Sequence, residues 1–312
     1  MIDGILIVDK PENFTSHDVV ARLRRILKTK RIGHTGTLDP FATGVLVMLV
    51  GKATRLAQFL DKDAKEYEAV VRFGCATDTG DRTGELRITN YELRDFSEDE
   101  LETVLVNFRG EIEQTPPMYS AKKVDGVKLY ELARKGVEIE RKPVKISIYE
   151  LETISPPGTQ SGTEEKTKNQ KPKTKDHALR VKCSAGTYIR TLAEDIGRKL
   201  EVGAHLAELR RTKAGKFDLA KAVTIEELET IVFENRLDEV LISMNEAVSH
   251  LPPVVLSAQE IEDTSHGKRL NLANDDWADN QTVRMIDEAE NLIAVGFYIK
   301  AENFIQPKLV LI

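Results

Sequence analysis

The sequence predicts an α+β protein with one large domain followed by a small β-rich domain. Alternating apolar and polar residues over 67–73 are typical of a strand, and apolar residues at helical spacing over 16–28 are typical of an amphipathic helix. The chain has 312 residues, 41% of them hydrophobic, which is enough for a sizeable core. A Leu-Pro-Pro-Val stretch at 251–254 marks the domain boundary, and short alternating runs such as 292–299 follow it.

The N-terminal segment predicts a strand followed by a basic helix. Residues 5–8 are an apolar run, and an Asp-Lys-Pro turn separates them from the helix, whose N-cap we assign to Ser16. Asn13 in this turn tolerates the left-handed backbone region better than most residues. No acidic residue interrupts the basic residues that follow, which are Arg22, Arg24, Arg25, Lys28, Lys30 and Arg31. This block suggests an anionic partner, and a solvated helix face explains it equally well.

Residues 33–44, Gly-His-Thr-Gly-Thr-Leu-Asp-Pro-Phe-Ala-Thr-Gly, are the most informative segment. Its glycines permit conformations closed to other residues, and Pro40 fixes the backbone angle after Asp39. The apolar run at 45–50 is typical of a buried strand. The sequence therefore predicts a rigid loop that holds Asp39 against the core. An Asp-Pro pair is more often an ordinary turn, so the dipeptide alone leaves the role of Asp39 open.

A strand and a helix are predicted next. The strand covers 67–73 and places Tyr67 on its apolar side. The helix covers 97–105, where Ser97 and Glu100 have the spacing of a capping box.

Two later segments lack the pattern of a core element. Residues 114–136 begin as a proline-stiffened loop and end as a helix, and we interpret 114–145 as an arm with 8 basic and 4 acidic residues between positions 116 and 145. Residues 155–177 contain no hydrophobic residue, so they cannot bury apolar surface to offset the entropy lost on ordering. We predict a flexible polar insertion there.

The rest of the large domain predicts a strand, a helix and a strand. Residues 179–183 alternate, residues 191–200 have helical spacing, and residues 203–213 form a strand with a basic end. Arg210, Arg211 and Lys213 at this end form a basic cluster with Lys216, just beyond it.

Charge is distributed unevenly along the chain. The net charge is −6, but the part from Val223 onward holds 17 acidic and 6 basic residues, against 34 and 39 in the part before it. The whole-chain value argues mildly against a nucleic-acid partner, whereas the basic N-terminal part favours an anionic one.

Several classes of site are not supported by the sequence. Cys75 and Cys183 belong to no ligand pattern and predict reduced, buried thiols. The six histidines lack metal-ligand spacing, so we expect no metal. Gly51-Lys52-Ala53 fails the P-loop pattern, and no Rossmann fingerprint or nucleophile elbow occurs, so we expect no cofactor. No run resembles a signal peptide or a membrane span, and we expect a cytoplasmic protein.

Six motifs in a fixed order carry a resemblance to a known family. They are Val-Asp-Lys-Pro with Thr-Ser near the N-terminus, the 33–44 loop, Lys-Glu-Tyr-Glu at 65–68, Pro-Pro-Met-Tyr-Ser-Ala at 116–121, Gly-Thr-Tyr-Ile-Arg-Thr at 186–191, and Gly-Ala-His-Leu-Ala-Glu-Leu-Arg-Arg at 203–211. Together they resemble the TruB family of tRNA pseudouridine synthases. The resemblance implies isomerisation of uridine 55 in the TΨC loop of tRNA to pseudouridine, without a cofactor.

The resemblance implies catalytic roles for two residues. Asp39 would be the catalytic aspartate, acting as a nucleophile or as a base. Arg190 would pair with it, because an adjacent cation keeps a carboxylate ionised in a dry pocket. Without the resemblance, Arg190 would be interpreted as a surface charge at the end of a strand.

Four further residues would bind the substrate. Tyr67 would stack on the target base, although its apolar alternation partners also fit a core aromatic. His34 would fill the space of the flipped-out uridine or support the flipped loop. Tyr188 and Leu209 would line the pocket, and for Leu209 a plain core role is equally compatible.

The resemblance also implies an architecture and a mode of RNA binding. A pseudouridine synthase catalytic domain with a mixed, largely antiparallel sheet flanked by helices would cover 1–250, and a PUA-like domain would cover 251–312. The arm would act as a mobile thumb over the T-loop. We predict RNA contact at the basic helix 22–31, at the arm over 116–145 and at the basic end of the strand at 203–213.

We expect a monomer that binds the T-arm of tRNA, with no protein partner and no membrane contact. Two other functions stay open at this stage: a tRNA-binding protein that remodels tRNA folding without catalysis, and a synthase that acts on other RNAs. Of these, the non-catalytic protein has no need for Asp39 and Arg190.

Overall fold

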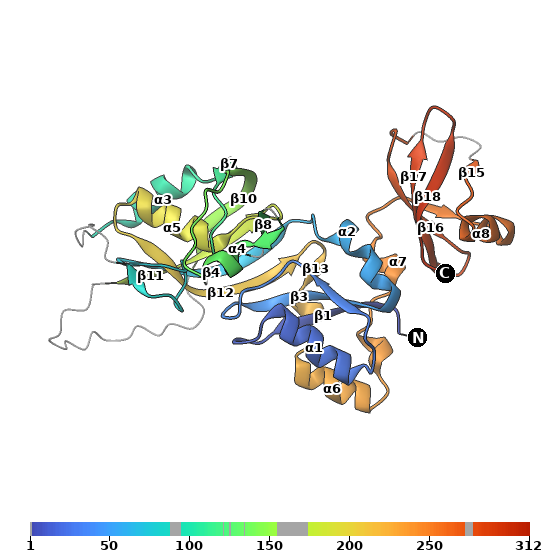
Figure 1. Ribbon diagram of the computed structural model, residues 1–312, viewed down its shortest axis with the longest axis horizontal. Helices are drawn as coiled ribbons and strands as arrows, with labels where there is room; N and C mark the ends of the chain where they lie inside the picture. Colours follow the sequence, from blue (N-terminus) through green and yellow to red (C-terminus); the bar gives the residue numbers. More distant parts are fainter. Residues whose placement is uncertain are drawn as a thin grey trace.

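A nine-stranded sheet runs through the large domain (Figure 1). The computed structural model describes residues 2–87, 95–120, 122–124, 126–133, 135–154, 174–271 and 277–312. The main strands in spatial order are β1 (Gly4–Lys10), β3 (Thr43–Val50), β12 (Ala204–Ala214), β4 (Lys65–Phe73), β11 (Lys175–Cys183), β10 (Val144–Ile154) and β7 (Gly110–Gln114), with β2 (Ile32–Thr35) beside β3 and β13 (Phe217–Asp218) beside β12. Because β12 and β3 pair in parallel and the other pairs are antiparallel, the predicted mixed, largely antiparallel sheet is confirmed.

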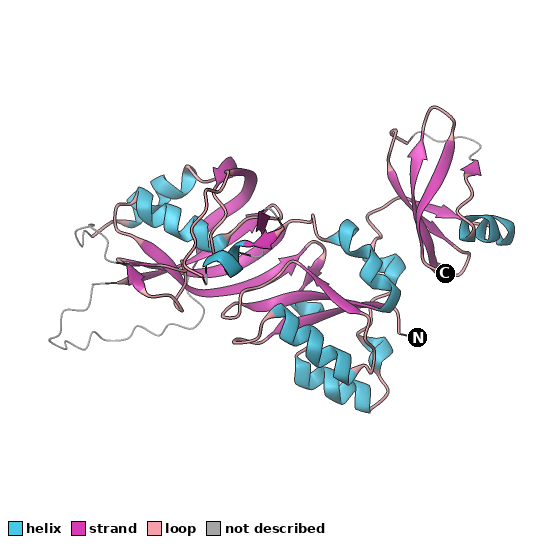
Figure 2. Ribbon diagram, in the orientation of Figure 1, coloured by secondary structure: helices cyan, strands magenta, loops and turns pink. Residues whose placement is uncertain are grey.

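Helices flank this sheet, as predicted (Figure 2). α1 (Ser16–Ile26) packs on α6 (Ile225–Phe233) beside β1 and β3, whereas α5 (Ile189–Lys199) packs on β12 and α3 (Glu98–Val106) on β10. The shorter elements are η1 (Gly51–Leu56), α2 (Ala57–Leu60), β5 (Ala76–Thr77), β6 (Leu86–Arg87), β8 (Lys123–Val124), β9 (Val127–Lys128), α4 (Leu129–Ala133), η2 (Leu219–Lys221), η3 (Leu237–Glu239) and α7 (Met244–Ala247).

The alternation predicted for residues 67–73 orients β4 in the sheet. Tyr67, Ala69, Val71 and Phe73 are all buried, and they share one apolar core with residues of β11, α5 and β12. The intervening residues of β4 are partly exposed. One face of β4 therefore points into the core, and Tyr67 lies on that face at the end nearer the 33–44 loop.

A second sheet of five strands forms the C-terminal region. Its strands in spatial order are β14 (Pro253–Val255), β16 (Thr282–Ile286), β17 (Leu292–Ile299), β18 (Phe304–Val310) and β15 (Leu270–Asn271), accompanied by α8 (Ala258–Ser265). The predicted β-rich C-terminal domain is thus confirmed. Leu309 and Leu311 join a core cluster with Ile5 and Val47, so the second sheet packs against the first domain.

Three predicted boundaries are wrong. The N-cap of α1 is Thr15, whose side chain forms a capping box with Asp18, and Ser16 is instead the first helical residue. β11 begins at Lys175, so the insertion predicted over 155–177 ends earlier; its residues 155–173 lie outside the described part of the chain. The helix predicted from 191 begins at Ile189.

Two other local predictions are confirmed. Asn13 adopts a positive φ of 65°, as expected for the turn before α1. Cys75 and Cys183 are both unpaired, buried thiols. Among the described residues, no helix is long and apolar enough to span a membrane.

Candidate active site

The loop that carries Asp39 is held by buried side chains from outside it. The Ser16 hydroxyl accepts a hydrogen bond from the Leu38 N–H at 3.0 Å. The ammonium group of Lys10, which is fully buried, donates to the carbonyls of Pro11, Phe14 and Pro40 at 2.8, 2.6 and 3.2 Å. Leu38 and Pro40 flank Asp39, so these bonds fix the backbone on both sides of the carboxylate. Ser16 was predicted to cap α1, but its hydroxyl binds the backbone of the loop instead.

Gly36 is clamped at the start of the same loop. Its N–H donates to Asp61 Oδ1 at 3.0 Å, and its carbonyl accepts from Arg211 Nη2 at 2.8 Å. Arg211 Nε also donates to the Val45 carbonyl at 2.7 Å, and the residue is 1% exposed. The predicted exposed basic surface therefore does not include Arg211, because its guanidinium is held by backbone carbonyls of the protein and lines the cavity.

Arg190 joins the loop to α5. Its Nε lies 2.9 Å from Asp39 Oδ2, and its Nη2 donates to Asp39 Oδ1 at 3.3 Å. The same guanidinium donates to the carbonyls of Tyr119 and Thr79 at 2.6 and 2.9 Å. Arg190 is buried, whereas 35% of the Asp39 side chain remains exposed. The aspartate is consequently fixed by a two-point ion pair and still accessible from the cavity.

A second carboxylate lies behind the arginine. Asp81 is buried, and its Oδ2 is 3.7 Å from Arg190 Nη1. Its Oδ1 accepts from the hydroxyls of Thr79 and Thr83 at 2.9 and 2.6 Å. The segment Asp-Thr-Gly-Asp-Arg-Thr-Gly at 78–84 contains this aspartate, which the sequence analysis did not identify as a site residue. One cation therefore lies between two carboxylates, bonded directly to Asp39 and at ion-pair distance from Asp81.

Burial shifts the pKa of two groups at the site toward the neutral form of each. Burial raises the pKa of Asp39 above the ordinary aspartate value, and the positive charge of Arg190 opposes that rise. Burial lowers the pKa of His34, with the neighbouring His17 acting in the same direction. The His34 ring lies edge-on to His17 at 5.5 Å between centroids, and its Nδ1 is buried without a hydrogen-bond partner among the described residues. These effects favour the neutral imidazole of His34, whose Nδ1 has no partner among the described residues.

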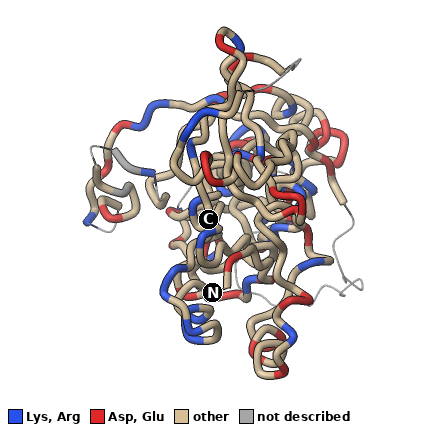
Figure 3. Tube along the Cα trace, turned by 90° about the vertical axis from the view of Figure 1, so that its right-hand side faces the viewer, with Lys and Arg blue, Asp and Glu red and all other residues tan. Residues whose placement is uncertain are grey.

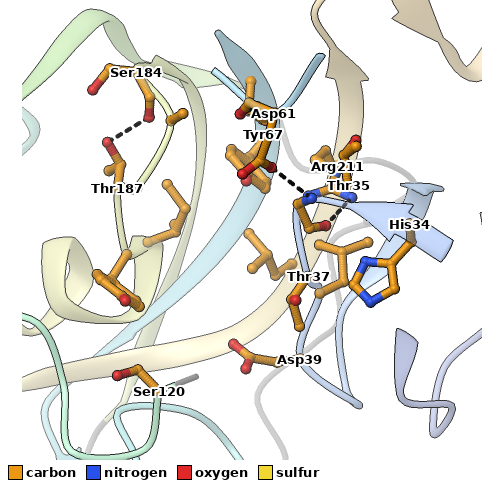
Figure 4. A pocket seen from close by; sticks show the side chains of 18 of the residues that line it. His34, Thr35, Thr37, Asp39, Asp61, Tyr67, Ser120, Ser184, Thr187 and Arg211 are labelled. Carbon is orange, nitrogen blue, oxygen red and sulfur yellow. Dashed lines mark hydrogen bonds between the residues drawn. The ribbon is translucent and has the colours of Figure 1, made fainter. Parts of the chain in front are cut away.

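A cavity of about 540 Å³ opens at Asp39 (Figure 4). Tyr67 is at its wall and 9% exposed, so it is both a core aromatic and a cavity residue. Residues that sequence reasoning missed also line the cavity, including Lys65, Asp61 and Ser120. All six site residues predicted from the sequence border this one space: His34, Asp39, Tyr67, Tyr188, Arg190 and Leu209.

Within the described ranges, no group of three or more His, Cys, Asp or Glu residues is arranged to hold a metal ion. The cavity combines the accessible carboxylate of Asp39, the buried arginines Arg190 and Arg211, and the flat aromatic wall of Tyr67. This arrangement can bind a planar ring and place a carboxylate against the atoms beside that ring.

Comparisons with known proteins agree over most of the chain. A family model described as TruB family pseudouridylate synthase (N terminal domain) matches residues 24–189, and one described as tRNA pseudouridylate synthase B C-terminal domain matches 190–249. The tRNA pseudouridine synthase B of Geobacillus thermodenitrificans is 44% identical over 271 residues, covering 87% of this chain and 86% of the relative. That of Bacillus cytotoxicus is 39% identical over 312 residues, covering 100% and 98%.

Solved structures extend the similarity to the whole fold. A chain of a Cbf5-Nop10-Gar1 complex superimposes with a TM-score of 0.72 and 27% identity, covering 99% of this chain and 85% of that one. A chain of an H/ACA RNP bound to a substrate RNA containing 2′-deoxyuridine gives a TM-score of 0.71 and 26% identity with the same coverage. The family matches, the relatives and the fold all agree, and the chain belongs to the TruB family of pseudouridylate synthases.

Proposed function

We propose that this protein converts uridine 55 in the T-arm of tRNA to pseudouridine, with Asp39 acting on the flipped-out nucleotide. The observation that carries the proposal is the ion pair between Asp39 and Arg190 at the wall of the 540 Å³ cavity. Such a carboxylate is fixed, accessible and next to a surface on which a base can stack. Family membership supports tRNA as the substrate, and the site supports the aspartate as its reactive group.

The reaction is an isomerisation and is balanced without any co-reactant. The N1–C1′ bond of the uridine breaks, the uracil turns, and a C5–C1′ bond forms while the proton at C5 is lost and N1 gains one. Asp39 would attack the sugar or the base as a nucleophile, or remove a ribose proton as a base. Arg190 would hold the carboxylate in its ionised form during either route, because it offsets the effect of burial on the pKa of Asp39.

The walls of the cavity would bind the flipped nucleotide. Tyr67 would stack on the uracil, with Leu209 and Tyr188 closing the sides of the ring pocket. His34 would lie where the uridine leaves the RNA stack, where its unpartnered Nδ1 can accept a hydrogen bond from RNA. These groups would recognise a planar base in an opened RNA loop rather than a long nucleotide sequence.

The tRNA would contact the exposed basic surfaces of the large domain. The basic residues of α1 are exposed, and Figure 3 shows Lys and Arg gathered along limited stretches of the chain. The arm over 114–145 would close over the T-loop, and the remaining cluster of Arg210, Lys213 and Lys216 would add phosphate contacts. We propose a catalytic domain over 1–250 and a PUA-like domain over 251–312. We also propose that the protein is a cytoplasmic monomer that acts without a protein partner or a metal ion.

Incubation with unmodified tRNA, followed by carbodiimide treatment and primer extension, tests the proposal. Wild type should convert uridine 55, and Asp39→Asn should lose at least about 10³-fold in rate while its affinity for tRNA changes little. Conversion that persists in Asp39→Asn contradicts the role of the aspartate. Binding without conversion indicates a tRNA-folding protein, and conversion confined to rRNA fragments indicates another RNA substrate.

A further inference from the structure

One buried hydroxyl lines the cavity without a hydrogen-bond partner among the described residues. Ser120 is 5% exposed, and its Oγ has no hydrogen-bond partner within the described parts of the chain. The residue nevertheless lines the 540 Å³ cavity that contains Asp39. A buried hydroxyl normally has a partner, because leaving it unpaired costs stability. A group that enters the cavity is therefore the natural partner of this hydroxyl.

The position of Ser120 indicates which part of a nucleotide it meets. The preceding carbonyl, that of Tyr119, accepts from Arg190 Nη2 at 2.6 Å, and the same arginine holds Asp39. Figure 4 shows Asp39 and Ser120 together at one end of the cavity and Tyr67 at the other. When the uracil stacks on Tyr67 and the ribose C1′ faces Asp39, as the proposed reaction requires, the ribose lies at the end of the cavity that holds Ser120.

We infer that Ser120 binds the 2′-hydroxyl of the target ribose and thereby makes the enzyme prefer a ribonucleotide at this position. The inference rests on the proposed function, because it assumes that a uridine occupies the cavity. A serine hydroxyl and a 2′-hydroxyl can each donate and accept, so they complement each other in either direction. The 2′-hydroxyl is also the group that distinguishes RNA from DNA at a single nucleotide.

The fold of the segment does not depend on the Ser120 hydroxyl. The backbone N–H of Ser120 donates to the Met118 carbonyl at 2.9 Å, and its carbonyl accepts from the Tyr130 N–H at 3.1 Å. Ser120→Ala preserves both bonds and removes one oxygen. Thr191 offers a matched control, because its hydroxyl is also buried and unpartnered among the described residues, next to Arg190, yet it faces a separate cavity.

Binding of T-arm RNA to the full-length Asp39→Asn protein tests the inference by fluorescence anisotropy. RNAs with uridine or 2′-deoxyuridine at the target position are compared with Ser120 intact or changed to Ala. Ser120→Ala should weaken binding of the uridine RNA by about 3- to 10-fold and of the deoxyuridine RNA by less than about 2-fold. Thr191→Val should leave both affinities unchanged.

Equal losses on the two RNAs, or no loss on either, overturn the inference, because the hydroxyl would then have no specific relation to the 2′ position. Pseudouridine formation by the wild-type protein is measured on the same uridine RNA. Its absence contradicts the proposed function, whereas the binding comparison remains interpretable because it requires only that the RNA binds. Failure of the RNA to bind at all contradicts both.

Discussion

The loop over 36–44 and the arm over 114–145 border the same cavity, but they are built differently. Side chains from outside the loop bind its backbone at Gly36, Leu38 and Pro40, and Leu38, Phe41 and Ala42 are buried. Among the described side chains between 114 and 145, the buried ones are Gln114, Pro116, Ser120 and Leu129. The loop is therefore part of the core, whereas most of the arm is a surface layer over it.

This difference separates the requirements of chemistry from those of substrate entry. A reactive carboxylate must be held near its target to within a fraction of an ångström, which requires a rigid support. A segment that covers a large substrate must open, and segments with few buried contacts open at low cost. We therefore expect changes around the loop to act on the chemical step or on folding, and changes in the arm to act on RNA binding.

Arg190→Met should have the largest effect on the chemical step. The change removes the cation between Asp39 and Asp81, and the single-turnover rate should fall by at least about 10³-fold, equivalent to about 4 kcal/mol. Arg190 lowers the pKa of Asp39 against the effect of burial, so its loss should raise that pKa further. The acidic limb of the pH–rate profile should consequently move to higher pH, and rates measured between pH 5 and 9 test this.

Arg198→Met is the matched control for this prediction. Arg198 lies on the same helix, is exposed and pairs with Asp195 rather than with the loop. Its removal should leave the single-turnover rate and its pH dependence unchanged. A comparable loss in Arg198→Met would mean that the effect comes from the helix and not from the ion pair.

Gly44→Ala should have the largest effect on folding. Gly44 has a φ of 98°, and an added Cβ would lie 2.2 Å from the Arg211 carbonyl oxygen and 2.9 Å from its nitrogen. Since both atoms belong to the backbone of β12, neither can move aside, and we expect a loss of at least about 3 kcal/mol in the free energy of unfolding. Urea unfolding measures this.

Gly33→Ala is the control within the same motif. Gly33 has no positive φ, and its added Cβ would meet only the Thr54 methyl at 3.8 Å. It should therefore change stability by less than about 1 kcal/mol. The clash at Gly44 arises where β12 pairs in parallel with β3. Equal losses of stability at both glycines would show that this close contact is not what makes the loop rigid.

The sequence identified the residues around the cavity better than the residues that hold the Asp39 loop in place. The six cavity residues could be named because the resemblance to a known family assigns them roles, and alternation over 67–73 placed Tyr67 on the buried face of β4. The supports could not, because Lys10, Ser16 and Arg211 act on backbone groups of Pro40, Leu38 and Gly36 that are distant in sequence. Carbonyl and N–H groups are present at almost every residue, so no residue pattern indicates which of them a buried side chain will bind.

Boundary errors had a similar physical origin. Residues 175–177 have no hydrophobic residue and were predicted as part of an insertion, yet they extend β11 along β4. Arg72 of β4 forms two hydrogen bonds with the Asp176 carboxylate, at 2.8 and 2.7 Å, and His177 packs edge-on against Phe73. Pairing with a formed neighbour strand thus stabilises polar residues that composition alone assigns to a loop.

The pH dependence of stability tests the support at Lys10. Burial lowers the pKa of Lys10 from 10.5 to about 8, so between these values the unfolded chain binds more protons at this lysine than the folded protein does. Stability from this group therefore rises with pH across that window. Relative to Lys10→Met, wild type should gain about 2 kcal/mol between pH 8 and pH 10, measured by urea unfolding. Parallel pH curves for the two proteins would show that Lys10 is not buried as a cation.

Gly136→Ala in the arm should have the smallest effect, and it tests the comparison directly. Gly136 shares a positive φ, of 70°, with Gly44, but an added Cβ there would have no neighbour within 4 Å. The cost is then the strain of the left-handed conformation alone, about 1 kcal/mol. Because the arm contributes few buried side chains, this strain should alter the affinity for tRNA more than the single-turnover rate, as titration and rapid quenching can measure. If the rate falls as far as in Arg190→Met, the arm is part of the catalytic framework, and the distinction between a rigid loop and a covering layer fails.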